Sequence, residues 1–160
     1  MSIEKKKSRI YPHSIIDILP GDVLYSSIGK STYYVGHSVI IGTDYMIKEV
    51  LPGIPAWHTM TIEQFWHRHH VGDRITLLRA IEGANEAAIW ITENLHRFQT
   101  YHLANYDMSN IGKSYCYKFI AQVFQYGANL DIVRNSNRIL LPHDIKKSPK
   151  LQKVALFIVG

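Results

Sequence analysis

The order of apolar patterns along the chain sets the strongest limit on its fold. Runs rich in β-branched and aromatic residues, ended by turn residues, dominate the first half, whereas apolar residues at helical spacing dominate the second. The expected strands cover residues 23–25, 33–41, 45–51, 74–79 and 154–159. The expected helices run from a cap at Thr59 or Thr61 to His69, over 83–98, and over 114–126, closed by Gly127. Strands before helices are typical of an α+β fold, and the closely spaced first three strands favour an antiparallel meander.

Length and composition are those of one globular domain over residues 1–160. Of these residues 46% are hydrophobic and 19% charged, with no internal repeat or long linker. No apolar run approaches the ~20 residues of a spanning helix, so we expect no transmembrane segment. The net charge of +5 comes from the two ends, and we expect residues 1–10 and 146–153 to be basic, solvated segments. Because the body of the chain is balanced in charge, we expect no nucleic-acid partner.

The single cysteine and the N-terminal residues bear on the cellular compartment. One cysteine, Cys116, excludes an internal disulfide and a zinc site of the CxxC type. The basic residues 5–9 would suit a signal peptide, but the segment 11–14 (YPHS) follows them in place of an apolar region. We therefore expect no signal peptide and a cytoplasmic protein.

Cys116 stands near the beginning of a predicted helix, two residues after a candidate cap at Ser114. It shares the apolar helix face with Phe119, Ile120 and Val123. The N-terminus of a helix presents unpaired backbone N–H groups and a partial positive charge, and both favour a thiolate. Cys116 is therefore a candidate nucleophile. The alternative is a small buried residue that packs in the core.

Two ionisable residues break the apolar pattern of predicted strands. His37 alternates in phase with Val39 and Ile41, and Glu49 is in phase with Ile47 on the next strand. A buried carboxylate or imidazole needs a hydrogen-bonding partner. If the two strands pair, His37 and Glu49 can each be the partner of the other. The pair is either structural or, together with a cysteine at a helix start, the base and orienting residue of a nucleophilic site.

Several short motifs, in this order, resemble one known superfamily. They are residues 19–24 (LPGDVL), 36–42 (GHSVIIG), 47–50 (IKEV), 115–120 (YCYKFI) and the tail 141–151. The sequence resembles the circularly permuted NlpC-type papain-like cysteine peptidases and amidases, namely the YiiX-like proteins, with similarity to the short poxviral members. In this family the histidine strand precedes the cysteine helix, the reverse of the order in papain.

The resemblance implies a fold and a site. The fold is a small antiparallel β-barrel or sheet packed against the helix that bears the nucleophile. Cys116 matches the nucleophile, His37 the general base, and Glu49 the residue that orients the imidazole. Tyr106 and Asp107 match a pair that borders the substrate cleft, although a plain turn fits them equally well. Tyr117 stands where many bacterial members have serine, and is a third candidate for substrate binding.

The implied activity is that of a thiol hydrolase, a cysteine peptidase or amidase, acting on an amide or ester carbonyl. Its expected substrates are a peptide, an amino-acid amide or a lipid-like acyl compound, and no cofactor is expected. Two alternatives stay open. One is an acyltransferase or lipid-directed thiol enzyme on the same fold, and the other is a peptide- or lipid-binding module without catalysis.

Two further clusters have a functional and a structural interpretation. Residues 67–70 (HRHH) are a candidate metal-binding cluster, because neighbouring histidines can bind one ion. Cationic side chains at the C-terminal end of a short helix are favourable without a metal, however. We therefore expect no metal site here. The aromatic residues Trp57, Phe65 and Trp66 could line a groove for an acyl chain, whereas core packing is the preferred interpretation.

Overall fold

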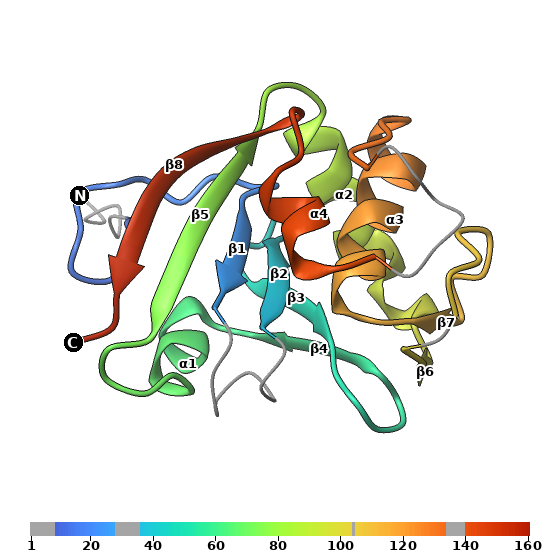
Figure 1. Ribbon diagram of the computed structural model, residues 1–160, viewed down its shortest axis with the longest axis horizontal. Coiled ribbons are helices and arrows are strands. Elements are labelled where there is room, and N and C mark those ends of the chain that lie inside the picture. Colours follow the sequence, from blue (N-terminus) through green and yellow to red (C-terminus); the bar gives the residue numbers. More distant parts are fainter. Residues whose placement is uncertain (1–8, 28–35, 104, 134–139) are drawn as a thin grey trace, which may run out of the picture.

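A computed structural model describes residues 9–27, 36–103, 105–133 and 140–160 (Figure 1). Its main element is a six-stranded antiparallel sheet with the strand order β4-β3-β2-β1-β5-β8. The strands are β1 (Val23–Ser26), β2 (His37–Ile41), β3 (Ile47–Val50), β4 (Trp57–Met60), β5 (Arg74–Ala80) and β8 (Leu151–Ile158). Two short strands, β6 (Thr100–Tyr101) and β7 (Lys113–Ser114), form a separate parallel pair.

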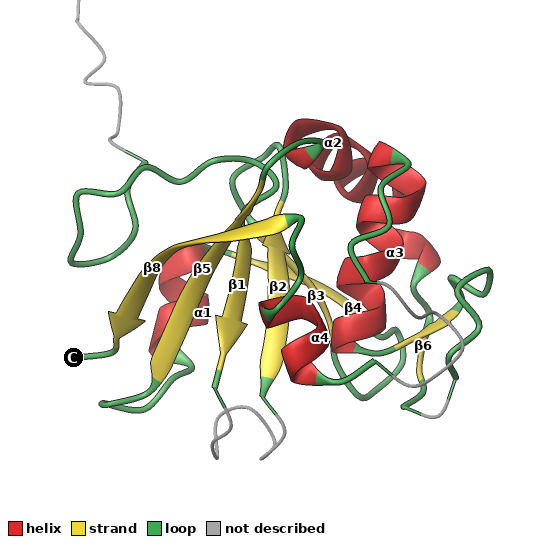
Figure 2. Cartoon of the chain, turned by 45° about the horizontal axis from the view of Figure 1, so that its top comes forward, coloured by secondary structure: helices red, strands yellow, loops and turns green. Residues whose placement is uncertain are grey.

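The helices lie on both faces of the large sheet. They are α1 (Ile62–His67), α2 (Ala84–Asn94), the 3-10 helix η2 (Leu95–Arg97), α3 (Cys116–Ala128) and α4 (Pro142–Lys146). In Figure 2, α2, α3 and α4 gather at one side of the sheet and α1 lies behind it. No helix in the described part of the chain has the length and apolar character to cross a membrane.

Strand alternation divides the core into two clusters. Ile40 of β2 belongs to a cluster with Phe119 and Ile120 of α3. Its neighbours Val39 and Ile41 belong to a second cluster with Phe65 of α1. Because successive side chains of a strand point to opposite faces, the early strands are buried on both sides, and their continuous apolar runs follow from this double burial.

The fold is α+β, and the first three strands form the expected antiparallel meander. The expected fold is a small antiparallel barrel or sheet, and the described strands form a sheet that is not closed into a barrel. Strands β4 and β8 stand at the two ends of the strand order, and each pairs with a single neighbour, β3 and β5 respectively. The sheet of the described residues is therefore open.

Both predicted ends of the cysteine helix differ from the structure. Ser114 belongs to β7, so Tyr115 is the N-cap and Cys116 is the first residue of α3. Gly127 lies inside the helix. A side chain does not fit at this position, since a Cβ there would come within 2.9 Å of the Cα atom of Ala87 of α2. Glycine thus permits close packing of α2 on α3. The residue that ends α3 is Asn129, whose left-handed backbone conformation has φ 50°.

Other predicted boundaries shift by a few residues, and one strand was missed. The first residues of the run 33–41 lie outside the described part, and β2 begins at His37. Strand β4 has the sequence WHTM, with no clear alternation of apolar and polar residues, which explains why it was not predicted. Of the two basic segments, residues 1–8 lie outside the described part. The four lysines of 146–153 are exposed, although this segment includes the start of β8.

Candidate active site

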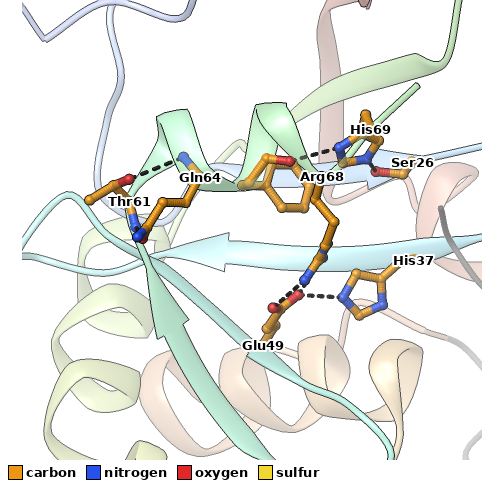
Figure 3. A network of polar contacts seen from close by, with 8 residues as sticks. Ser26, His37, Glu49, Thr61, Gln64, Arg68 and His69 are labelled. Carbon is orange, nitrogen blue, oxygen red and sulfur yellow. Dashed lines mark hydrogen bonds and ion pairs between the residues drawn. The ribbon is translucent and has the colours of Figure 1, made fainter. Parts of the chain in front are cut away.

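His37 and Glu49 meet on the sheet, as the alternation of β2 and β3 predicts. The Nε2 atom of His37 lies 2.6 Å from Oε2 of Glu49, and both side chains are buried. The register pairs Ile41 with Ile47, which places Glu49 on the same face as His37. Figure 3 shows the imidazole directed at the carboxylate. The prediction that the two strands bring these residues together is confirmed.

Arg68, which the sequence did not single out as part of the site, completes the surroundings of Glu49. Its Nη1 donates to Oε1 at 2.7 Å and its Nη2 to Oε2 at 2.8 Å (Figure 3). Burial by itself would raise the pKa of Glu49, but the hydrogen bonds from His37 and Arg68 outweigh it and lower this pKa to about 2. Glu49 is therefore an ionised carboxylate with both oxygens engaged.

Cys116 reaches the other side of the imidazole from α3. Its side chain lies beside that of His37 and acts on the pKa of the imidazole, and Cys116 is 1% exposed. Since Nε2 of His37 is taken by Glu49, Nδ1 is the ring nitrogen left for the sulfur. Burial alone would lower the pKa of His37, but the interactions with Cys116 and Glu49 outweigh it and raise this pKa to about 9.

Two tyrosine hydroxyls also lie against Cys116. Tyr101 of β6 lies beside the cysteine, and Cys116 contributes to the shift in its pKa. Tyr117, a predicted substrate-binding residue, is 4% exposed and follows Cys116 directly in α3. Burial first, and then the charge of the cysteine, raise the pKa of both phenols. The sulfur is thus surrounded by polar groups as well as aliphatic ones.

Tyr101 could not be found from the sequence. It is held next to α3 because Tyr101 pairs with Ser114 in the parallel pair of β6 and β7. A strand of two residues has no periodicity to detect, and the contact depends on how the intervening loop folds back.

Tyr106 and Asp107 lie in that intervening loop. The Asp107 carboxylate accepts from the backbone N–H of Ser109 at 3.0 Å and from its hydroxyl at 2.7 Å, so it stabilises its own turn. These hydrogen bonds lower the pKa of Asp107. Tyr106 is exposed. The geometry of this pair is that of a turn, and its part in substrate binding stays a prediction.

The histidines of the HRHH segment (residues 67–70) differ in burial and in their contacts. Buried His69 uses both ring nitrogens, since Nδ1 lies 2.8 Å from the Phe65 carbonyl oxygen and Nε2 lies 2.7 Å from Oγ of Ser26 (Figure 3). His67 and His70 are exposed. Among the described residues no group of three or more histidine, cysteine or acidic side chains is placed to hold a metal ion.

The three aromatic residues considered for an acyl groove do not share one surface. Phe65 and Trp66 are buried in the cluster on the α1 face. Trp57 is partly buried and packs against the cluster that contains α3. Core packing accounts for Phe65 and Trp66.

Comparison with known proteins gives one informative likeness. A solved structure described as the metalloprotein YiiX from Escherichia coli O157:H7 superimposes with a TM-score of 0.54 and 12% sequence identity. The match covers 85% of this chain and 96% of that one. No protein-family model matches the sequence, and the search of curated proteins found no match. At this low identity the likeness is one of fold: this chain is similar to YiiX in its α+β architecture over most of its length.

Proposed function

We propose that the protein is a thiol hydrolase that attacks an amide or ester carbonyl with Cys116, activated by His37 and oriented by Glu49. The observation that carries this proposal is that the imidazole of His37 lies between the carboxylate of Glu49, at 2.6 Å, and Cys116, the first residue of a helix. A nucleophile, a base and a group that orients the base are the parts required for covalent catalysis on a carboxylic acid derivative.

We further propose that the fold is papain-like with permuted order. Two observations support this. The histidine strand β2 precedes the cysteine helix α3 in the chain, as in the family that the motifs resemble. The likeness to YiiX extends over most of both chains.

The proposed reaction begins with the proton of Cys116 on His37. The thiolate attacks the carbonyl carbon, and the oxyanion forms beside the backbone N–H of Cys116, which at the first helical position has no partner within the helix. The Tyr101 hydroxyl, beside Cys116, is the candidate for a second donor. His37 then gives its proton to the leaving amine or alcohol as the C–N or C–O bond breaks.

The thioester that results is resolved by an acceptor. Water, deprotonated by His37, breaks the C–S bond and returns the thiol, which completes a hydrolysis. An alcohol or amine in place of water gives acyl transfer by the same steps. We propose hydrolysis of a peptide, an amino-acid amide or a lipid-like acyl compound, because these share the carbonyl that the residues address.

YiiX is described as a metalloprotein, but a metal ion does not fit the residues of the proposed site in this chain. Both oxygens of Glu49 are held by Arg68, and one of them also by Nε2 of His37. A metal cation bound to these oxygens would be repelled by the positive charge of Arg68 and would have to replace its two hydrogen bonds. The proposed chemistry therefore belongs to the side chains alone.

A generic activated ester tests the proposal without knowledge of the natural substrate. With p-nitrophenyl acetate we expect a burst of p-nitrophenolate and about one acetyl group per chain, located on Cys116 by peptide mass spectrometry. Cys116→Ala is expected to abolish the burst and keep the fold, because the change removes little volume. A folded wild-type protein that shows neither burst nor acetylated Cys116 would favour the non-catalytic binding module, which the 1% exposure of Cys116 also fits.

A further inference from the structure

We propose that Arg68 is a positioning residue for the base, and that the end of α1 is the element that sets the direction of the His37 imidazole. This inference rests on the proposed function, since it concerns the same site. It adds a fourth residue that neither the motifs nor the resemblance points to.

The geometry of the ion pair fixes the carboxylate as well as neutralising it. Arg68 donates from two nitrogens to the two oxygens of Glu49, at 2.7 Å and 2.8 Å. A guanidinium fork and a carboxylate that bond in this way are held close to one plane. Oε2 also accepts from His37 at 2.6 Å. Holding the carboxylate therefore fixes the point at which the imidazole N–H is anchored.

The next residue of the chain holds the strand on the other side of β2. Nδ1–H of His69 donates to the Phe65 carbonyl, so Nε2 accepts from the hydroxyl of Ser26 at 2.7 Å. Ser26 of β1 is the register partner of His37. Two successive residues after α1 thus bind the strands that flank His37, Arg68 on β3 and His69 on β1.

The charges around the site agree with this arrangement. Arg68 balances Glu49, so that a proton on His37 is balanced by the sulfur on its other side. Burial, the largest cause, lowers the pKa of His69, and a neutral His69 adds no further positive charge next to Arg68 and His37. Further titratable neighbours are His58 of β4, opposite Glu49 in the register, Tyr101 and Tyr117 beside Cys116, and Asp73 near His69.

Removing the guanidinium should therefore change how fast Cys116 reacts with an alkylating reagent. Without Arg68, buried Glu49 loses one of its two counter-charges and takes up a proton at higher pH, and it no longer holds the imidazole in one direction. The ion pair of sulfur and imidazole then forms only at higher pH.

The test is the pH dependence of iodoacetamide labelling of Cys116, the only cysteine of the chain. For Arg68→Met we expect labelling at mildly acidic pH to slow by about 10- to 100-fold and the acid limb of the profile to move up by about one pH unit or more. Arg68→Lys keeps the charge and loses the fork, and should lie between this variant and the wild type.

A matched control exists elsewhere in the fold. Arg79 binds Asp22 through Nε at 2.7 Å and Nη2 at 2.9 Å, and its side chain is 26% exposed compared with 28% for Arg68. Arg79→Met should therefore carry a similar structural cost and leave the labelling profile unchanged.

The outcomes separate this inference from the proposed function. If wild-type labelling is fast and depends on His37 but Arg68→Met has the wild-type profile, the positioning role is wrong and the proposed function stands. Wild-type labelling no faster than that of a free thiol contradicts the proposed function itself. If the labelling profile changes equally in Arg68→Met and Arg79→Met, the role of Arg68 is structural and the positioning role is wrong. Should Arg68→Met fail to fold, Arg68→Lys against Arg79→Lys decides, with slower labelling expected only in the first.

Discussion

Replacing His37 by alanine is expected to slow iodoacetamide labelling of Cys116 at neutral pH by about 100-fold or more. In the proposed mechanism the imidazole accepts the thiol proton and its positive charge stabilises the thiolate, so its loss should leave an ordinary buried thiol. The Arg68–Glu49 pair stays intact in this variant, and circular dichroism should show a folded protein. The rate is measured by mass spectrometry over a time course with excess reagent.

His70→Ala is the matched control for this experiment. His70 is exposed and lies two residues after Arg68, so its removal should leave the labelling rate unchanged. A His37→Ala protein that labels as fast as the wild type would show that the imidazole does not activate the sulfur. The contact between them would then be structural only.

Glu49→Gln is expected to lower the free energy of unfolding at neutral pH by about 3 kcal/mol or more. The substitution leaves the guanidinium of Arg68 and the imidazole of His37 next to a neutral amide at a fully buried position. Removing one partner of a buried ion pair leaves the other charge without compensation, and this is the main cause of the loss.

The pH dependence of this loss follows from the direction of the pKa shift. The pKa of Glu49 is lowered from 4.5 to about 2, so its contribution to stability is fully present above pH 4.5. As the pH falls toward about 2, the contribution disappears, since the folded protein must then also take up the proton. The difference between wild type and Glu49→Gln should therefore shrink on acidification.

Urea unfolding at neutral and at strongly acidic pH measures both effects. Glu63→Gln, an exposed change on α1, is the control and should stay within about 0.5 kcal/mol of the wild type. A Glu49→Gln loss that is the same at both pH values would contradict an ionised Glu49 at the centre of the network.

The pair of His37 and Glu49 could be predicted from the sequence because its cause is local. Each residue interrupts an apolar alternation of period two, and the two strands are too close in the chain to pair in any way but antiparallel. The position of Cys116 at a helix start was predictable for a similar reason, although the cap proved to be Tyr115 in place of Ser114.

The remaining site residues depend on contacts that no local pattern encodes. Arg68 reaches Glu49 across 19 residues of sequence, and only the packing of α1 against the sheet brings it there. Tyr101 depends on a parallel pair of two-residue strands. The sequence predicts a helix end at Gly127 because glycine often ends helices, whereas here the close approach of α2 requires a glycine inside the helix. Whether the sheet is open or closed into a barrel likewise depends on whether its two edge strands, β4 and β8, pair with each other, and no local pattern encodes this.

The protonation state of His37, followed by NMR of the imidazole ring, reports on sulfur, ring and carboxylate together. In the wild type we predict that His37 stays protonated through neutral pH and titrates near 9, because Cys116 and Glu49 both hold the charged ring. In Cys116→Ala the titration should move to lower pH, since one of these partners is gone. A wild-type His37 whose pKa is at or below its ordinary value of 6.5 would contradict the arrangement of sulfur, imidazole and carboxylate on which the proposed chemistry depends.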